Sequence, residues 1–185
     1  MRPTHPTLEK DTKVTREEVI ELINGERVYQ ERRWGKYQHS AGGYLTYMWR
    51  YYRQLEDLEK EPDDTAAHYS GRSAIRKMAA LAVACMEKRG CVRRDGEARK
   101  GDTPRDWVYA AIAEERRYQE EKWPHQQPFE LSEELTVLRR YLRVADELWT
   151  VNTDESLALD VIRKIATACV RYMEYHVVPP RYDAL

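Results

Sequence analysis

The sequence predicts an all-α fold in which two tandem three-helix repeats pack as a pseudo-twofold helical bundle. Three observations lead to this prediction. Apolar residues recur at i, i+3 and i+4 in long segments, alternating β patterns are absent, and the string ERVYQERRW (26–34) returns as ERRYQEEKW (115–123). Each residue of the second string lies 89 positions after its counterpart, which indicates an internal duplication.

The boundaries of the two repeats follow from capping and turn signals. Thr15 and Glu18 form a capping box at the start of the first helix, and Pro104 lies in the first turn of the helix that opens the second half. In the first half we expect helices over 16–34, 44–60 and 71–88. A charged, glycine-punctuated linker separates the halves. The expected order is a tail, repeat 1, the linker, repeat 2 and a C-terminal tail, over residues 1–14, 15–88, 89–102, 103–177 and 178–185.

The second and third helices of each repeat also match in sequence. LTYMWRYYRQLEDL (45–58) aligns with LTVLRRYLRVADEL (135–148), and IRKMAALAVACME (75–87) aligns with IRKIATACVRYME (162–174). A single repeat is too short to bury three apolar helix faces comfortably by itself. We therefore expect the two repeats to pack against each other, like a covalently linked homodimer.

Composition narrows the class of protein. Hydrophobic residues make up 42% and charged residues 34%, and 31 basic against 32 acidic side chains leave no global charge to favour nucleic acid. No signal peptide or membrane span is expected, because no apolar run approaches ~18 residues. Three cysteines without metal spacing favour a reduced, cytoplasmic compartment. Thirteen Tyr and five Trp against one Phe suit a partly wet cleft, or a helical core that uses Tyr.

Two carboxylates lie on apolar helix faces. Glu26 and Glu115 continue the stripes that begin at Val19 and Val108, where a charge is costly unless it is paired, hydrogen-bonded or metal-bound. One interpretation is a buried ion pair with an arginine of the second helix of the same repeat. The other is a functional role for both carboxylates.

Six cations form the main candidate site. The arginine pairs on the second helices lie one turn apart, so both heads of each pair emerge on one side, and one lysine occupies an equivalent place on each third helix. Such cations could converge on a phosphate or carboxylate, or they could form a solvated face that is neutralised by glutamates. The predicted anion-binding residues are Arg50, Arg53, Lys77, Arg140, Arg143 and Lys164.

Aromatic residues complete the candidate ligand-binding set. Trp34 and Trp123 end their helices beside turn residues, where each could stack on a base or fasten the helix end to the bundle. No P-loop, GxGxxG, GxSxG or HExxH motif is present, so neither nucleophilic catalysis nor zinc binding is predicted. The secondary candidates for ligand contact are Glu26, Tyr29, Trp34, Tyr51, Glu115, Tyr118, Trp123 and Tyr141.

The ordered motifs resemble the phage-type branch of the MazG-like all-α nucleoside triphosphate pyrophosphohydrolases. The resemblance rests on ERVYQERRWGKYQHS, then a helix, then IRKMAALAVACMEK, and over both repeats it covers about 150 of the 185 residues. Members of this family begin with E-R-x-x-Q-x-x-K-W-G before a helix that carries E-E-x-x-E. A later helix carries E-x-x-D or, in this branch, E-L-x-x-x-A-A-x-A. The family's acidic residues hold Mg²⁺, which binds the triphosphate and activates water.

This sequence departs from the family at the metal-binding positions, where none of the expected carboxylates is present. The E-E-x-x-E positions carry Arg50, Tyr51 and Gln54 in repeat 1 and Arg140, Tyr141 and Val144 in repeat 2. The E-x-x-D positions carry Ala74 and Lys77, then Val161 and Lys164. Cations in these places repel Mg²⁺ but could neutralise phosphates directly.

The resemblance and the departure together imply a catalytically inactive protein, without cofactor, that binds a nucleotide or a phosphorylated small molecule. In a phage protein this could serve to sequester a nucleotide signal of the bacterial host. One alternative is an active, Mg²⁺-dependent pyrophosphohydrolase with displaced ligands among Glu56, Asp57, Glu59, Asp146, Glu147 and Asp160. A further alternative is a structural or protein-binding helical bundle. No membrane partner is expected, and homo-oligomerisation is left open.

Overall fold

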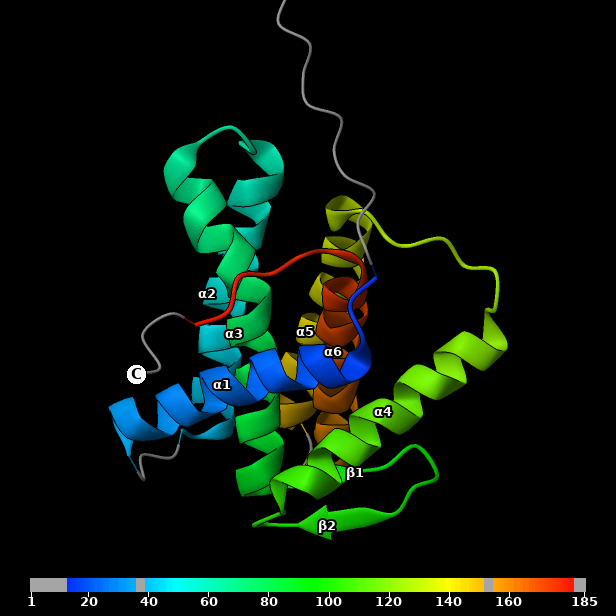
Figure 1. Ribbon diagram of the computed structural model, residues 1–185. Coiled ribbons are helices and arrows are strands. Elements are labelled where there is room, and N and C mark those ends of the chain that lie inside the picture. Colours follow the sequence, from blue (N-terminus) through cyan, green and yellow to red (C-terminus); the bar gives the residue numbers. More distant parts are fainter. Residues whose placement is uncertain (1–12, 36–38, 152–154, 182–185) are drawn as a thin grey trace, which may run out of the picture.

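The computed structural model describes residues 13–35, 39–151 and 155–181. Within them, six helices and one short hairpin follow each other along the chain (Figure 1). The first half holds α1 (Arg16–Trp34), α2 (Ala41–Lys60) and α3 (Thr65–Arg89), and the hairpin consists of β1 (Gly90–Val92) and β2 (Ala98–Lys100). The second half holds α4 (Arg105–Lys122), α5 (Leu131–Val151) and α6 (Ser156–Tyr175). The prediction of an all-α bundle is confirmed.

Four of the helices form a central bundle. The hairpin of α2 and α3 packs against the hairpin of α5 and α6, with α3 against α6 and α2 against α5. Helices α1 and α4 lie across the α3–α6 pair, on the side away from α2 and α5 (Figure 1). Each of these two crossing helices contacts the third helix of both halves, so the halves share one structure. No described helix is both long enough and apolar enough to cross a membrane.

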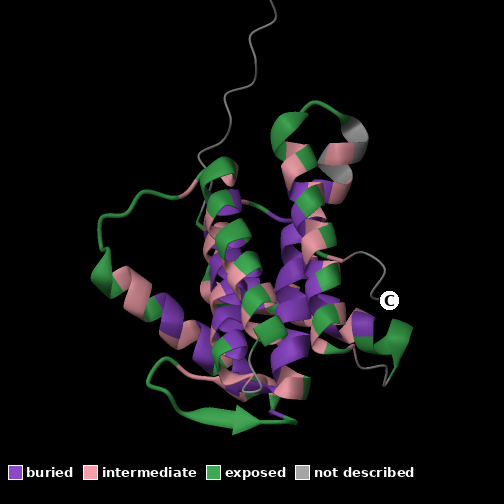
Figure 2. Cartoon of the chain, turned by 180° about the vertical axis from the view of Figure 1, so that it is seen from behind, coloured by how far each residue is buried: buried purple, intermediate pink, exposed green. Residues whose placement is uncertain are grey.

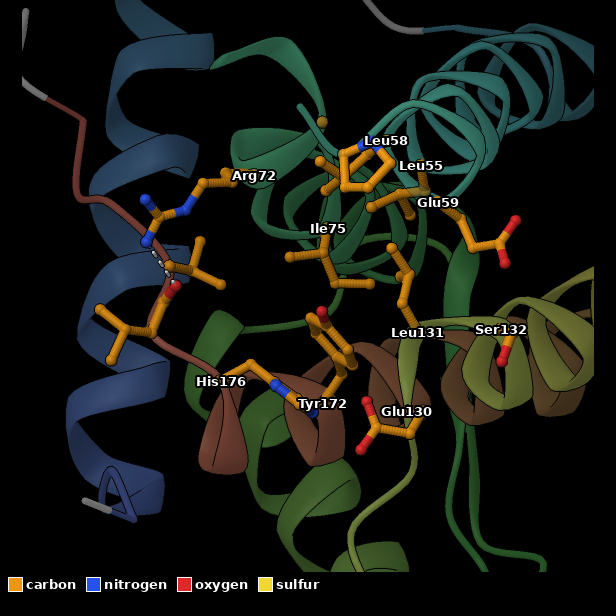
Figure 3. A pocket seen from close by; sticks show the side chains of 14 residues that line it. Leu55, Leu58, Glu59, Arg72, Ile75, Glu130, Leu131, Ser132, Tyr172 and His176 are labelled. Carbon is orange, nitrogen blue, oxygen red and sulfur yellow. Dashed lines mark hydrogen bonds between the residues drawn. The ribbon is translucent and has the colours of Figure 1, made fainter. Parts of the chain in front are cut away.

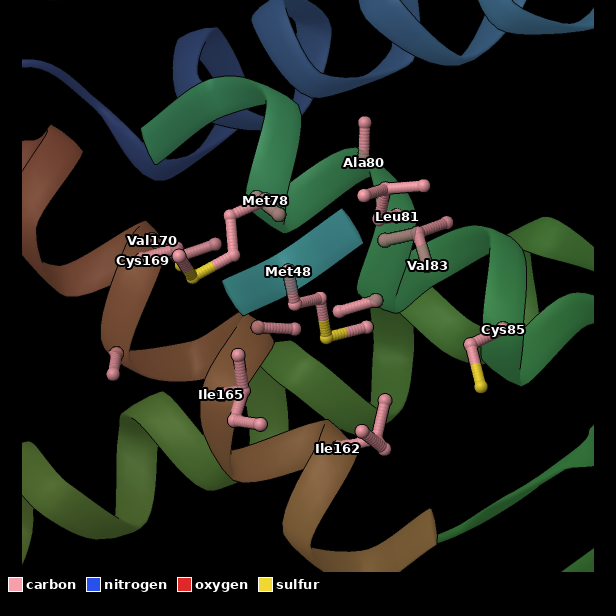
Figure 4. Packing of buried hydrophobic residues seen from close by; sticks show 14 of the residues in the cluster. Met48, Met78, Ala80, Leu81, Val83, Cys85, Ile162, Ile165, Cys169 and Val170 are labelled. Carbon is pink, nitrogen blue, oxygen red and sulfur yellow. The ribbon is translucent and has the colours of Figure 1, made fainter. Parts of the chain in front are cut away.

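The core lies where the two hairpins meet. Met48 of α2 lies beside Ile162 and Ile165 of α6, and Met78 of α3 lies nearer Val170 of α6 (Figure 4). All of these side chains are fully buried. Buried residues follow the inner faces of the four bundle helices (Figure 2). Because this burial is continuous across both halves, neither half has a separate core.

Helix starts mostly follow the expected capping chemistry. The Thr15 hydroxyl accepts a hydrogen bond from the Glu18 amide at 3.2 Å, and the Glu18 carboxylate accepts one from the Thr15 amide at 2.8 Å, which confirms the capping box. The third helix begins at Thr65 rather than at residue 71, and Asp64 caps it. Gly71 is therefore inside the helix. A Cβ there would lie 2.6 Å from the Cβ of Leu58, so the glycine permits close packing of α2 and α3.

The expected linker contains structure that we did not predict. Residues Gly90 to Val92 pair antiparallel with Ala98 to Lys100, and Cys91 is fully buried. Gly90 has φ of 115°, and a Cβ there would meet the carbonyl oxygen of Arg99 at 2.3 Å. Three residues per strand are too few to show as a β pattern in sequence, and tertiary contact with α6 stabilises the hairpin.

The two halves exchange equivalent contacts. Arg16 at the start of α1 donates to Glu174 at the end of α6 at 2.9 Å, and Arg105 at the start of α4 donates to Glu87 at the end of α3 at 2.9 Å. The backbone repeats the exchange: the amides of Val14 and Thr103 donate to the carbonyl oxygens of Glu174 and Glu87 at 2.9 and 2.8 Å. Each half thus holds the first helix of the other. Such reciprocity is the pattern of an isologous dimer interface.

Candidate functional site

Glu26 and Glu115 each form a buried ion pair, but not with the arginines that we expected. The partner of Glu26 is Arg76 at 3.2 Å, and the partner of Glu115 is Arg163 at 3.0 Å; all four residues are buried. Both arginines lie on the third helices, so the interpretation that an arginine of the second helix supplies the charge is wrong. A buried carboxylate that lost this partner would be strongly unfavourable.

A second arginine reaches each carboxylate from the opposite half. Arg181, after α6, lies 3.3 Å from Glu26 and stacks over the ring of Tyr29 at 3.3 Å from its centroid. Arg94, after α3, lies 3.8 Å from Glu115 and stacks over Tyr118 at 3.0 Å. The segment that we expected to be a C-terminal tail is thus packed against repeat 1 as far as residue 181, and residues 182–185 lie outside the described structure.

The backbone of these two segments also binds the buried arginines. Arg76 donates to the carbonyl oxygen of Pro179, and Arg163 donates to that of Val92. The segments after α3 and after α6 therefore perform the same function in exchanged positions. Each buried ion pair is completed by residues from the other half of the chain.

The rest of the repeated string forms a second network. Arg27 donates to Glu87 at 2.7 Å and to the Gln30 side-chain oxygen at 3.2 Å. Its counterpart Arg116 donates to Glu174 at 3.1 Å and to Gln119 at 3.0 Å. In each copy of the string, Glu, Arg, Tyr and Gln at fixed spacing join the first helix to two neighbours. One is the third helix of the same repeat, and the other is the segment that follows the third helix of the other repeat.

The predicted cations are only partly brought together. In repeat 1, Arg50 lies over the ring of Tyr47 at 5.0 Å, and Lys77 lies over that of Tyr51 at 5.8 Å, so the two cations flank neighbouring aromatic residues. In repeat 2, Lys164 forms an ion pair with Asp160 at 2.7 Å. Arg50, Arg53, Arg140 and Arg143 are all exposed.

Two adjoining cavities between α1, α2 and α3 form what we call the aromatic cleft. The Gln30 chamber has a volume of about 370 Å³, and its walls are Arg27, Gln30, Glu31, Trp34, Gly35, His39, Tyr44, Leu81, Ala84 and Lys88. The Tyr51 chamber has a volume of about 320 Å³, and its walls are Trp34, His39, Tyr47, Tyr51 and Leu81. The chambers share Trp34, His39 and Leu81. Each volume is in the usual range for a small-molecule site.

Gln30, in the wall of this cleft, has a buried side-chain hydrogen-bond donor that is unused. Its side chain is 4% exposed, and its oxygen accepts from Arg27, which leaves the amide nitrogen directed elsewhere. That nitrogen has no hydrogen-bond partner among the described residues. A buried donor without a partner costs roughly 1–3 kcal/mol, so a rotation of the Gln30 side chain that brings this nitrogen to a ligand oxygen would recover that cost.

The two chambers differ in charge. In the Gln30 chamber, Arg27 and Glu31 form an ion pair at 3.2 Å. Lys88 also lines that chamber. The lining of the Tyr51 chamber is uncharged, but Arg50 and Lys77 lie over the rings of Tyr47 and Tyr51 in its wall, and Glu26 is held by two arginines. Burial lowers the pKa of Lys77, and the nearby Arg181 and Arg76 lower it further, whereas Glu26 raises it. Burial also lowers the pKa of His39, which favours its neutral form at pH 7.

Repeat 2 has a smaller cavity at the place of the Gln30 chamber. Its volume is about 210 Å³, and Arg116, Gln119 and Trp123 line it as their counterparts line the larger one. Arg171 also lines it and forms an ion pair with the fully buried Glu134 at 2.6 Å. In repeat 1, Ala84 aligns with Arg171, and Tyr44 aligns with Glu134.

A further cavity, of about 520 Å³, lies at the end of the bundle between the α2–α3 hairpin and the end of α6 (Figure 3). Leu55, Ile75 and Tyr172 form much of its wall, and Glu59 and Glu130 lie at its edge (Figure 3). Glu59, one of the carboxylates of the active-enzyme alternative, is among its lining residues, whereas none of the predicted anion-binding residues is. Two carboxylates make this cavity a poorer place for an anion than the aromatic cleft.

The family's Mg²⁺ does not fit the residues in the aromatic cleft. Arg50 and Lys77 occupy its expected ligand positions, and Glu26 is held by two arginines. Two of the six displaced carboxylates have other partners: Asp146 accepts from Trp49 at 2.6 Å, and Asp160 pairs with Lys164. Among the described residues, no three His, Cys, Asp or Glu side chains are grouped in a way that could hold a metal ion.

Comparison with protein-family models, with curated proteins and with solved structures finds no match. The likeness to MazG-like proteins therefore rests on the sequence motifs alone. Of the residues predicted from the sequence, Trp34 and Tyr51 line the cleft, and Arg50 and Lys77 lie over the rings of Tyr47 and Tyr51 in its wall. Sequence reasoning missed the lining residues Gln30, His39, Tyr44, Tyr47 and Lys88. The repetition of Gln30 in Gln119, and the excess of Tyr, were the signals that pointed toward them.

Proposed function

We propose that the protein binds a nucleotide or a phosphorylated small molecule in the aromatic cleft and does not hydrolyse it. The observation that carries this proposal is the unused Gln30 amide in a cavity lined by Trp34, His39 and Tyr44. Aromatic rings accept any base by stacking, and a buried amide donor suits a ring carbonyl or a phosphate oxygen. A chamber flanked by Arg50 and Lys77 supplies the complementary charge.

The absence of hydrolysis follows from the same residues. Phosphoryl transfer in the family depends on carboxylates that hold Mg²⁺, whereas this cleft has cations at those positions. Arg50 and Lys77 can stabilise phosphates without a metal but cannot activate water as a bound metal does. In a phage-encoded protein, such a site would serve to sequester a nucleotide signal of the host, as the resemblance implies.

The test measures binding and turnover on the same protein. Isothermal titration with the four ribonucleoside triphosphates, with EDTA present, should show saturable binding, and Lys77→Met should weaken it ~10-fold, as expected for loss of one charged contact of ~1.5 kcal/mol. Lys60→Met, at the far end of α2, is the matched control. Binding that requires Mg²⁺, together with pyrophosphate release, would establish the active-enzyme alternative instead.

A structural or protein-binding bundle is the second candidate, because so many of the duplicated charges are paired internally. Arg27, Arg76 and their counterparts all have carboxylate partners, and these pairs join helices to each other. Under this alternative no nucleotide should raise the melting temperature, and Lys77→Met should change neither stability nor any binding signal.

A further inference from the structure

The two repeats differ at two positions that line the Gln30 cavity or its counterpart. In repeat 1 the aligned positions hold Tyr44 and Ala84, which leave the Gln30 chamber open. In repeat 2 they hold Glu134 and Arg171. The helices, the repeated string and the buried pairs are shared by both halves, so this difference is local to the cleft.

The Glu134–Arg171 pair fills part of the repeat 2 cleft. Arg171 donates two hydrogen bonds to Glu134, at 3.2 and 2.6 Å, and Glu134 is fully buried. The ring of Phe129, from the loop before α5, lies 4.4 Å from the guanidinium of Arg171. A guanidinium held by two hydrogen bonds and an aromatic ring is fixed in place, so the cavity beside it cannot readily enlarge.

Repeat 2 also lacks two features of the Tyr51 chamber, an aromatic ring and a lysine without an acidic neighbour on its own helix. Val137 aligns with Tyr47, which removes one aromatic wall and the ring over which Arg50 lies. Asp160 aligns with Ser73 and forms an ion pair with Lys164, so the lysine equivalent to Lys77 is already neutralised. Both changes reduce the affinity of this half for a ring that carries phosphate.

We infer that repeat 1 alone binds the ligand, with one molecule per chain, and this inference rests on the proposed function. In repeat 2, the Glu134–Arg171 pair closes the cleft. The ligand has a planar heteroaromatic ring and an anionic group. Its ring lies in the Gln30 chamber against Trp34. Its anionic group lies at the Tyr51 chamber, where Arg50 and Lys77 lie over the rings of Tyr47 and Tyr51.

The two tryptophans provide a matched pair for the test. Trp34 and Trp123 are 48% and 47% exposed and end equivalent helices. Titration of the full-length chain with ATP and GTP should give one site per chain. Trp34→Ala should weaken binding at least ~10-fold, the usual effect of losing a stacked aromatic, whereas Trp123→Ala should leave the affinity unchanged. Inorganic triphosphate, which has no ring, should be sensitive to Lys77→Met but not to Trp34→Ala.

A second variant transfers the closing pair to repeat 1. Tyr44→Glu with Ala84→Arg places the residues of repeat 2 in the open chamber and should abolish nucleotide binding while the helical content is kept. If this variant does not fold, the tryptophan pair still decides the question. Two sites per chain, or equal losses from Trp34→Ala and Trp123→Ala, would overturn the one-site inference and leave nucleotide binding intact. No binding of any probe would overturn the proposed function, and the inference with it.

Discussion

The buried ion pair of repeat 2 allows a quantitative test of the fold. Glu115 is 4% exposed and has Arg163 at 3.0 Å and the half-exposed Arg94 at 3.8 Å as its cations. The change Arg163→Met keeps the volume of the side chain but leaves the carboxylate with a single, more distant charge. A buried ion left without its partner destabilises a protein by about 3–5 kcal/mol.

The magnitude can be refined by comparison with repeat 1. Glu26 keeps Arg181 at 3.3 Å when Arg76 is removed, so Arg76→Met should cost less than Arg163→Met. For a chain of this size, ~3–5 kcal/mol corresponds to a fall in melting temperature of roughly 6–20 °C. The double change Glu115→Leu with Arg163→Met should recover at least half of the loss. The carbonyl of Val92 then lacks its donor, which accounts for ~1–3 kcal/mol of the remainder.

Urea unfolding followed by circular dichroism at 222 nm measures these differences, and calorimetry checks the melting temperatures. The reasoning fails if Arg163→Met costs less than about 1 kcal/mol, which would mean that Glu115 reaches water. It also fails if the double variant is less stable than the single one, because the arginine would then act through packing rather than charge.

Three further predictions concern other regions. Gly71→Ala should destabilise the protein by about 1–3 kcal/mol in urea unfolding, because the new Cβ would lie 2.6 Å from Leu58 on α2; an unchanged midpoint would contradict the close packing. Native protein should react with Ellman's reagent at pH 8 far more slowly than unfolded protein, since Cys85, Cys91 and Cys169 are buried and burial raises the pKa of Cys91 to about 12; rapid native labelling would disagree. Binding of inorganic triphosphate should weaken as pH rises from about 7 towards 10.5. Burial lowers the pKa of Lys77, so its charge is lost before that of an ordinary lysine. Lys77→Arg should remove this dependence in titrations across that range.

The helices could be predicted from sequence because they depend on local pattern. The capping box at Thr15 and Glu18 fixed one helix start to the residue. The start of α3 was missed because Gly71 resembles a boundary in sequence, whereas in the structure it is a contact point for Leu58. Only the tertiary structure shows whether a glycine ends a helix or permits close packing inside one.

The site was predicted incompletely for a related reason. The adjacent residues Arg76 and Lys77 point about 100° apart on a helix, and the sequence does not show which of them faces Glu26. The crossing of α1 over α3 decides in favour of Arg76 and leaves Lys77 beside Tyr51. Likewise, no local pattern could reveal that Arg181, 155 residues away, reaches Glu26.

The exchange of the segments after α3 and α6 between the two halves has a consequence for how the protein folds during synthesis. Domains usually fold in order as the ribosome releases them, at about 5–20 residues per second. Here Arg76 must wait for the carbonyl of Pro179, which lies 103 residues later, and Glu26 must wait for Arg181. Repeat 1, although translated first, therefore gains its full set of charge contacts only after α6 has left the ribosome. Until then Glu26 and Arg76 have each other but lack these later contacts, so repeat 1 of an unfinished chain is less stable than that of the complete one.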